Sequence, residues 1–171
     1  MRVEFLGTGG AVIVPRPLCS CGICVQARER GVPYARSGPS VFVHGPDVLI
    51  GTPEEVKGGK RLLIAPDEIN GWVPLDWLRG ADLAIPQVGV FEFHPIMVGR
   101  RIHEENPVLK AESTFEETLQ IVDSLDARRT MLAHIEEMDE LTHDDLQEFG
   151  HRLRVEGRNV EFAYDTLIVD V

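Results

Sequence analysis

All three cysteines of the chain, Cys19, Cys21 and Cys24, fall within six consecutive residues. The last two are separated by a glycine and one further residue, and the glycine permits a turn tight enough for two thiolates to wrap one metal ion. Two prolines just upstream favour an extended approach, so we expect this stretch to be a loop and not a helix. A structural zinc takes four ligands in a tetrahedron. The spacing therefore predicts a zinc site whose fourth ligand comes from a distant segment of the chain.

Two other interpretations of the cysteines stay open at this point. Cys21 and Cys24 can form a disulfide or a redox pair that leaves Cys19 over, as in a redox-sensing thiol protein, or all three can be buried, inert thiols. The odd count and a polar N-terminus without a signal peptide argue against a secreted disulfide framework.

Length and charge limit the classes of protein to consider. A chain of 171 residues fits a single domain, which we place at 1–171, with enough sequence to bury a core. The formal net charge is 17 − 28 = −11, which disfavours nucleic-acid binding through neutralised phosphates. Charged residues and prolines break every long apolar run, so no membrane span is expected. We therefore expect a cytoplasmic protein with no membrane partner, and the sequence leaves a homodimer open.

Apolar periodicity and turn residues outline the secondary structure. Strands are predicted at 3–6, 40–44, 47–52, 61–65, 81–86, 129–134, 160–163 and 167–171. Short helices are predicted at 25–29 and 74–79, and a long loop at 88–111. Two longer helices should follow a capping box of Ser113 with Glu116 and an N-cap at Thr142. Strands first, followed by alternation of strand and helix, indicate a layered α/β domain.

Asp67 and His134 each follow an apolar strand. Sites in α/β folds gather at the carboxyl ends of strands, so these two side chains are expected close together at one edge of the sheet. Imidazole and carboxylate together suit zinc, manganese or iron. The alternative for each is structural: Asp67 caps a turn, and His134 is a hydrogen-bonded histidine beneath a loop.

Several of these segments together resemble the metallo-β-lactamase superfamily. The resemblance rests on the glycine-rich opening at 3–10, the three-cysteine loop, and the strands at 40–43 and 48–52. It is nearest to the phosphodiesterases related to the carbon–phosphorus lyase pathway enzyme, which carry a similar zinc loop. In the second half, 62–67 resembles the strand that delivers the metal-bridging aspartate, 130–135 the strand that delivers the last metal-binding histidine, and 162–165 the closing strand.

The resemblance implies an αββα sandwich and a metal-dependent hydrolase that acts on a small-molecule phosphodiester. In the complete family two metals would generate hydroxide and stabilise the charge that develops on phosphate. Asp67 would bridge the metals and His134 would bind one of them, and zinc or manganese would fill this second site. In the related phosphodiesterases a histidine three residues after the His134 position completes the structural zinc. This chain has Glu137 there, so Glu137, His143 or a water is expected as fourth ligand.

The chain also departs from the family pattern. The His-x-His-x-Asp-His signature should lie between the strand at 48–52 and Asp67, but the interval 53–60 contains no histidine. Gly51 and Glu112 stand where the family has an aspartate and often a histidine. We therefore predict a metallo-β-lactamase fold shortened in the middle, with phosphodiesterase-like activity impaired or absent. The alternative is a non-catalytic, zinc-binding relic of that fold.

Overall fold

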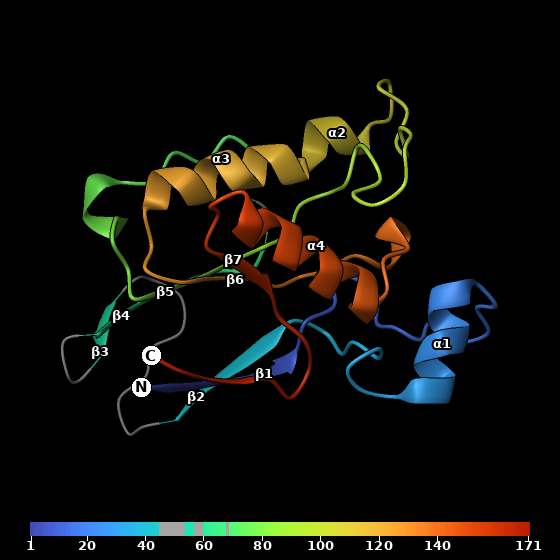
Figure 1. The fold of residues 1–171 in the computed structure, drawn as a ribbon, viewed down its shortest axis with the longest axis horizontal. Coiled ribbons are helices and arrows are strands. Elements are labelled where there is room, and N and C mark those ends of the chain that lie inside the picture. The colour runs from blue at the N-terminus through green and yellow to red at the C-terminus, as the bar shows by residue number, and fades with distance from the viewer. Residues whose placement is uncertain (45–53, 57–59, 68) are drawn as a thin grey trace.

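The computed structural model describes residues 1–44, 54–56, 60–67 and 69–171, and its strands form two sheets (Figure 1). The smaller sheet, in the order β2-β1-β8, consists of β1 (Arg2–Gly7), β2 (Ser40–His44) and β8 (Ile168–Asp170), all antiparallel. The larger sheet, in the order β3-β4-β5-β6-β7, consists of β3 (Glu54–Val56), β4 (Lys60–Ala65), β5 (Leu83–Pro86), β6 (Thr130–Leu132) and β7 (Val160–Phe162). Strands β4 to β7 run parallel, and β3 is antiparallel to β4.

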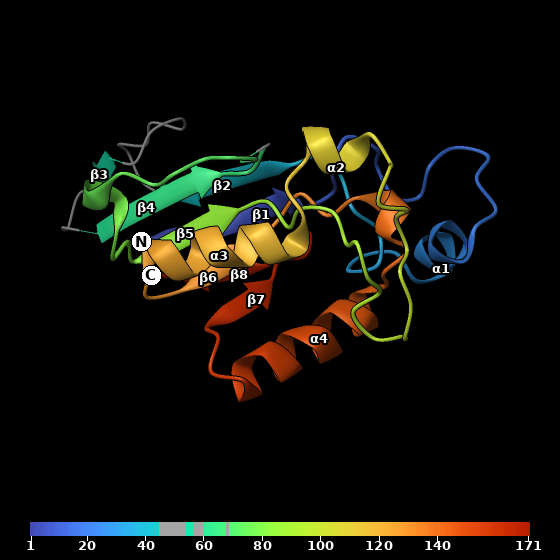
Figure 2. The same cartoon turned by 90° about the horizontal axis from the view of Figure 1, so that it is seen from above.

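Four α-helices are present in the described part of the chain. They are α1 (Gly22–Arg30), α2 (Val108–Ala111), α3 (Phe115–Leu125) and α4 (His143–Val155). Two short 3₁₀ helices, η1 (Asp76–Leu78) and η2 (Glu137–Asp139), lie between β4 and β5 and between β6 and α4. Both α3 and α4 lie on the outer face of the larger sheet (Figures 1 and 2). None of these helices is long and apolar enough to cross a membrane.

Two of the apolar clusters that hold the layers together span most of the described sheets. Side chains from both sheets meet in the first cluster, which is built around Val3, Phe5, Leu83, Ile85 and Met131. The second cluster lies between the larger sheet and its two long helices, and it includes Leu119, Leu132, Leu146, Leu153 and Phe162. The alternation of apolar residues along β1, with Val3 and Phe5 fully buried, is what turns the small sheet toward the large one.

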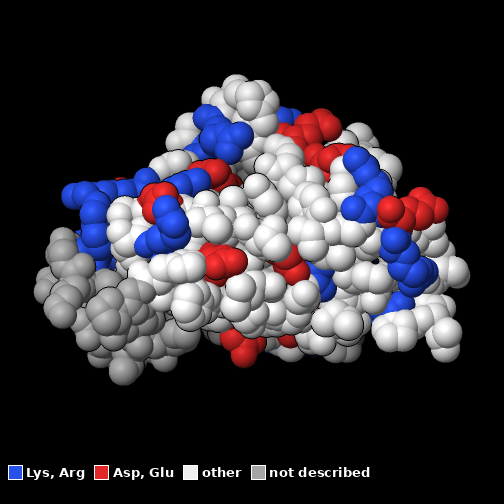
Figure 3. Space-filling model, turned by 90° about the horizontal axis from the view of Figure 1, so that it is seen from below, with Lys and Arg blue, Asp and Glu red and all other residues white. Residues whose placement is uncertain are grey.

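The outer face of the smaller sheet carries half-exposed apolar side chains, Leu6, Phe42 and Ile168. Among the described residues no helix lies over this face, so the described chain forms helix, sheet and sheet layers (Figure 1). Seen from below, this side of the molecule shows mostly uncharged side chains, with acidic and basic residues interspersed (Figure 3). The α/β class expected from the resemblance is therefore confirmed. Of the expected αββα layers, the described residues show both sheets and one helical layer, which covers the larger sheet.

Most predicted strands are confirmed, and four details of the helices are corrected. The strand predicted at 47–52 lies outside the described residues. The cysteine stretch is not wholly a loop, because α1 begins at Gly22, directly after Cys21 at the N-cap. The capping box of α3 is formed by Thr114 and Glu117, one residue later than predicted. The loop at 88–111 contains α2 at its end, and the predicted helix at 74–79 shortens to η1.

Candidate metal centre

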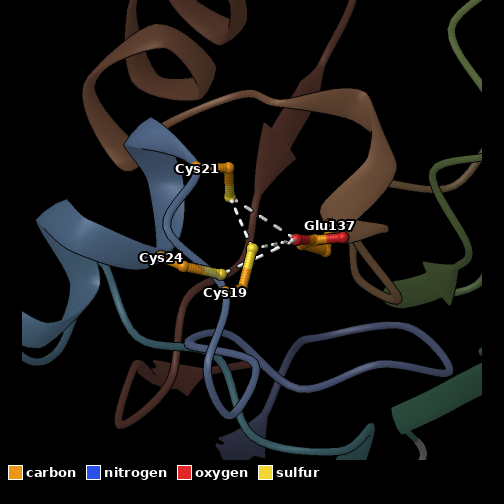
Figure 4. A group of neighbouring side chains, drawn as sticks. All are labelled: Cys19, Cys21, Cys24 and Glu137. Carbon is orange, nitrogen blue, oxygen red and sulfur yellow. Dashed lines mark hydrogen bonds between the residues drawn. The ribbon is translucent and has the colours of Figure 1, made fainter.

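The three cysteine sulfurs converge on one oxygen of Glu137 (Figure 4). Oε1 of Glu137 lies 3.7 Å from the Sγ of Cys19, 3.6 Å from that of Cys21 and 3.6 Å from that of Cys24. All four ligand atoms lie within 4.8 Å of one another. Among the described residues this is the one group of three or more cysteine, histidine or acidic side chains arranged so closely.

These distances match the edges of a zinc-centred tetrahedron. With bonds of about 2.3 Å to sulfur and about 2.1 Å to oxygen, tetrahedral geometry separates a sulfur from an oxygen ligand by about 3.6 Å and two sulfurs by about 3.8 Å. The observed sulfur–oxygen distances of 3.6 to 3.7 Å agree with this. The Cys19–Cys21 separation of 3.3 Å is shorter and would widen slightly around an ion. The donor set of three thiolates and one carboxylate also suits zinc.

The elements that carry the ligands are also held by contacts outside the cysteine group. Cys24, in the first turn of α1, is fully buried in a small cluster with Val14, Ile23 and Ala27. Glu137 opens η2, shortly after β6. The two segments are joined by further contacts, including hydrogen bonds from the Tyr34 hydroxyl and the Arg30 guanidinium to Asp144 at the start of α4. The site therefore links two elements that the fold already brings together.

Burial and local hydrogen bonds act oppositely on two of the thiols. Burial raises the pKa of the Cys24 thiol to about 11. The pKa of the Cys19 thiol is lowered, chiefly by hydrogen bonds from the backbone and side chain of Cys21. Zinc binds the thiolate form, so an ion entering this site would displace the proton that Cys24 retains at neutral pH.

Replacing Glu137 by glutamine tests the fourth ligand. The amide keeps the size of the side chain but removes the charge, and we expect zinc affinity to fall by more than the roughly 10- to 100-fold typical of an outer-shell partner. The measurement is competition with a chromophoric zinc chelator. Glu148→Gln, an exposed change on α4 of identical charge, should leave affinity unaltered. Equal affinities for the two variants would show that Glu137 is not a ligand.

The second predicted group lies at the carboxyl edge of the larger sheet. Because β4, β5 and β6 are parallel, Asp67 and His134 emerge at the same edge, and the charge of Asp67 contributes to raising the pKa of His134. The largest cause of that raised pKa is the hydrogen bond between His134 Nε2 and Glu136 Oε1, at 3.1 Å. His134 has a backbone φ of 56°, a left-handed conformation that is uncommon for a residue with a side chain. The structure thus brings the two predicted residues into one neighbourhood, with the His134 imidazole facing Glu136.

Glu136 is a member of this edge that the sequence reading missed. Its carboxylate also accepts a hydrogen bond from the Ala11 backbone at 3.1 Å, and its pKa is lowered, mainly by the bond to His134. A Cβ on Gly10 would lie 2.1 Å from Glu136 Oε1, so only a glycine allows the backbone of this turn to lie so close to the Glu136 carboxylate. The His-x-Glu spacing directly after an apolar strand was the available signal.

His143, the other side chain considered as fourth ligand, is engaged elsewhere. Its ring packs edge-on against Tyr34 and Tyr164, with centroids 5.6 and 5.1 Å away. Burial lowers its pKa. It is not part of the cysteine group, so Glu137 is the candidate fourth ligand among the described residues.

Comparisons with known proteins identify the fold. No protein-family model matches the chain. A search of the curated proteins gave no match either. The crystal structure of zinc-bound PqqB from Methylobacterium extorquens superposes with a TM-score of 0.60 at 16% identity, covering 100% of both chains. A diphosphatase of the PhnP family gives a TM-score of 0.46 at 14% identity, covering 99% of this chain and 97% of the other.

The similarity to PqqB extends over the whole chain at low identity, so it defines architecture and not activity. The chain has a metallo-β-lactamase-type fold, as the resemblance predicted. To that fold it adds a candidate metal centre of Cys19, Cys21, Cys24 and Glu137.

Proposed function

We propose that this chain is a zinc-binding protein of metallo-β-lactamase fold. Its metal is structural, and the edge of the larger sheet that carries Asp67 and His134 has no hydrolytic activity as the chain stands. The observation that carries the proposal is the convergence of three thiols and one carboxylate at tetrahedral distances. A site with four protein ligands leaves no position open for a substrate or an activated water, which is the mark of a structural zinc.

The arrangement of side chains at the carboxyl edge of the larger sheet supports the proposed lack of hydrolytic activity. Glu136 lies 3.1 Å from His134 Nε2, so one nitrogen that could bind a metal is engaged with a carboxylate. This hydrogen bond is the largest cause of the raised pKa of His134 and of the lowered pKa of Glu136, and a metal would have to compete with Glu136 for the imidazole. Within the described ranges, no group of three potential ligands forms around Asp67 and His134.

A second candidate is a metal-dependent hydrolase of small phosphodiesters. It is favoured by the shared neighbourhood of Asp67 and His134, where the family places metal ligands. Asp67 and His134 would then hold zinc or manganese, which would supply a hydroxide nucleophile and neutralise charge on the phosphate.

Metal analysis of the purified protein separates the two candidates. We expect one zinc per chain, lost in the variant Cys21→Ser and retained in the double variant Asp67→Ala, His134→Ala. Two or three metal ions per chain, reduced by the double variant, would favour the hydrolase. A chain with no bound metal after incubation with zinc would contradict both.

The matching activity prediction is that the chain does not hydrolyse an activated phosphodiester. With bis-p-nitrophenyl phosphate and added zinc or manganese, we expect release of nitrophenolate no faster than in the double variant. A dinuclear hydrolase needs several protein ligands and an open coordination position, and Asp67 with His134 supplies two. Robust turnover that either single substitution abolishes would establish a working site and overturn the proposal.

A further inference from the structure

The proposed ligand set has an unusual charge balance. Three thiolates and one carboxylate carry four negative charges, so a bound divalent ion would leave the centre with a net charge of about −2. Placing that charge in a partly buried pocket is costly unless a cation lies beside it. The side chain of Glu137 is only 12% exposed, so water alone solvates it poorly.

Arg16 supplies the cation and contacts three of the four ligands. Its Nη1 lies 3.7 Å from Oε2 of Glu137, the carboxylate oxygen that does not face the cysteines. Its Nη2 lies 3.8 Å from the Sγ of Cys19, and its backbone N–H donates to the Sγ of Cys24 at 3.3 Å. Glu137 can therefore turn one oxygen toward the metal position and the other toward the guanidinium.

The backbone around Arg16 is itself held in place. The Arg28 side chain, on α1, donates hydrogen bonds to the carbonyl oxygens of Arg16 and Cys19. No contact between the Arg28 guanidinium and a ligand sulfur or carboxylate is found among the described residues. Arg28 thus fixes the loop, while Arg16 is the cation that meets the ligand atoms.

On the basis of the proposed zinc site, we infer that Arg16 is a positioning residue that balances the charge of the Cys₃Glu centre and orients Glu137 toward the metal. A neutral histidine as fourth ligand would bring one negative charge fewer. The carboxylate at Glu137 therefore makes a neighbouring cation necessary, and Arg16 provides it.

The test is zinc affinity measured by competition with a chromophoric chelator at pH 7, in low and in high salt. Arg16→Gln should weaken zinc binding about tenfold in low salt, the lower end of the range for outer-shell partners, because the Arg16 side chain is 52% exposed. Arg16→Lys should retain most of the affinity, since it keeps the charge. The difference in zinc affinity between Arg16→Gln and the wild type should become smaller at about 1 M salt, because the Debye length there is about 3 Å and the charge of Arg16 is screened.

The matched control is Arg79→Gln, which removes one charge from an exposed pair with Asp76 and should bind zinc as the wild type does. If the wild type takes up no zinc, the proposed function is wrong. If it binds zinc but Arg16→Gln stays within twofold of it, the inference about Arg16 alone is wrong. Equal losses in Arg16→Gln and Arg16→Lys would also overturn it, because charge would then not be the cause.

Discussion

Replacing Cys24 by serine is expected to abolish zinc binding and to remove the effect of chelators on thermal stability. Zinc that binds only the folded chain stabilises it by about 4 kcal/mol when its free concentration is a thousandfold above Kd. For a chain of this size that corresponds to roughly 8 to 16 °C in Tm. The measurement is Tm by calorimetry with excess zinc and after treatment with a chelator, together with the zinc content.

The wild type should show a large drop in Tm on chelation, and Cys24→Ser should show a low Tm in both conditions. Ser20→Ala, an exposed change within the same loop, serves as control and should behave as the wild type. A Cys24→Ser protein that keeps its zinc, or that loses as much stability on chelation as the wild type, would contradict the metal centre.

Replacing Asp165 by alanine should cause a large loss of stability that does not depend on metal. Asp165 is 2% exposed and accepts three hydrogen bonds, from the backbone and hydroxyl of Thr8 at 2.8 Å each and from the backbone of Ser37 at 2.7 Å. It therefore ties the turn after β1, the segment after α1 and the turn before β8 to one another. Leaving buried donors unpaired costs about 1–3 kcal/mol each, so we expect a total loss of about 3 kcal/mol or more.

Urea unfolding, monitored by circular dichroism, measures this loss. Asp170→Ala removes a carboxylate five residues along, in an exposed pair with Arg2, and should change the unfolding free energy by no more than about 1 kcal/mol. If both variants unfold at the same urea concentration, Asp165 does not hold the three segments together.

The elements that the sequence predicts well are those with a local cause. Alternating or continuous apolar runs defined β1, β2 and the parallel strands, since burial on one or both faces leaves that pattern. The capping box of α3 was shifted by one residue because Ser113-x-x-Glu116 and Thr114-x-x-Glu117 are equally good local patterns. Packing decides between them: Ser113 is buried, and its hydroxyl accepts a hydrogen bond from Gln87 at 2.8 Å.

The candidate site could be predicted only in part, because its members come from distant segments. The three neighbouring cysteines predict a metal site by their spacing alone, but Glu137 became a specific candidate only through the resemblance. In the structure the His143 ring packs against Tyr34 and Tyr164, which leaves Glu137 as the candidate. The sequence alone does not show these ring contacts. Glu136 and Arg16 were missed for the same reason: a lone acid or base beside a motif is usually a solvated surface residue.

The separation between the cysteines and Glu137 has a consequence for how the protein is made. Glu137 follows Cys19, Cys21 and Cys24 by 118, 116 and 113 residues. At about 5–20 residues per second, a ribosome presents the three thiols roughly 6 to 24 s before the carboxylate emerges. During that interval the nascent chain offers free thiols to zinc, to oxidants and to one another. Cys24 packs in a local cluster with Val14, Ile23 and Ala27, but Glu137 can join the three thiols only after β6 and η2 have been made. We therefore expect the supply of zinc during synthesis to matter more to yield than zinc added afterwards.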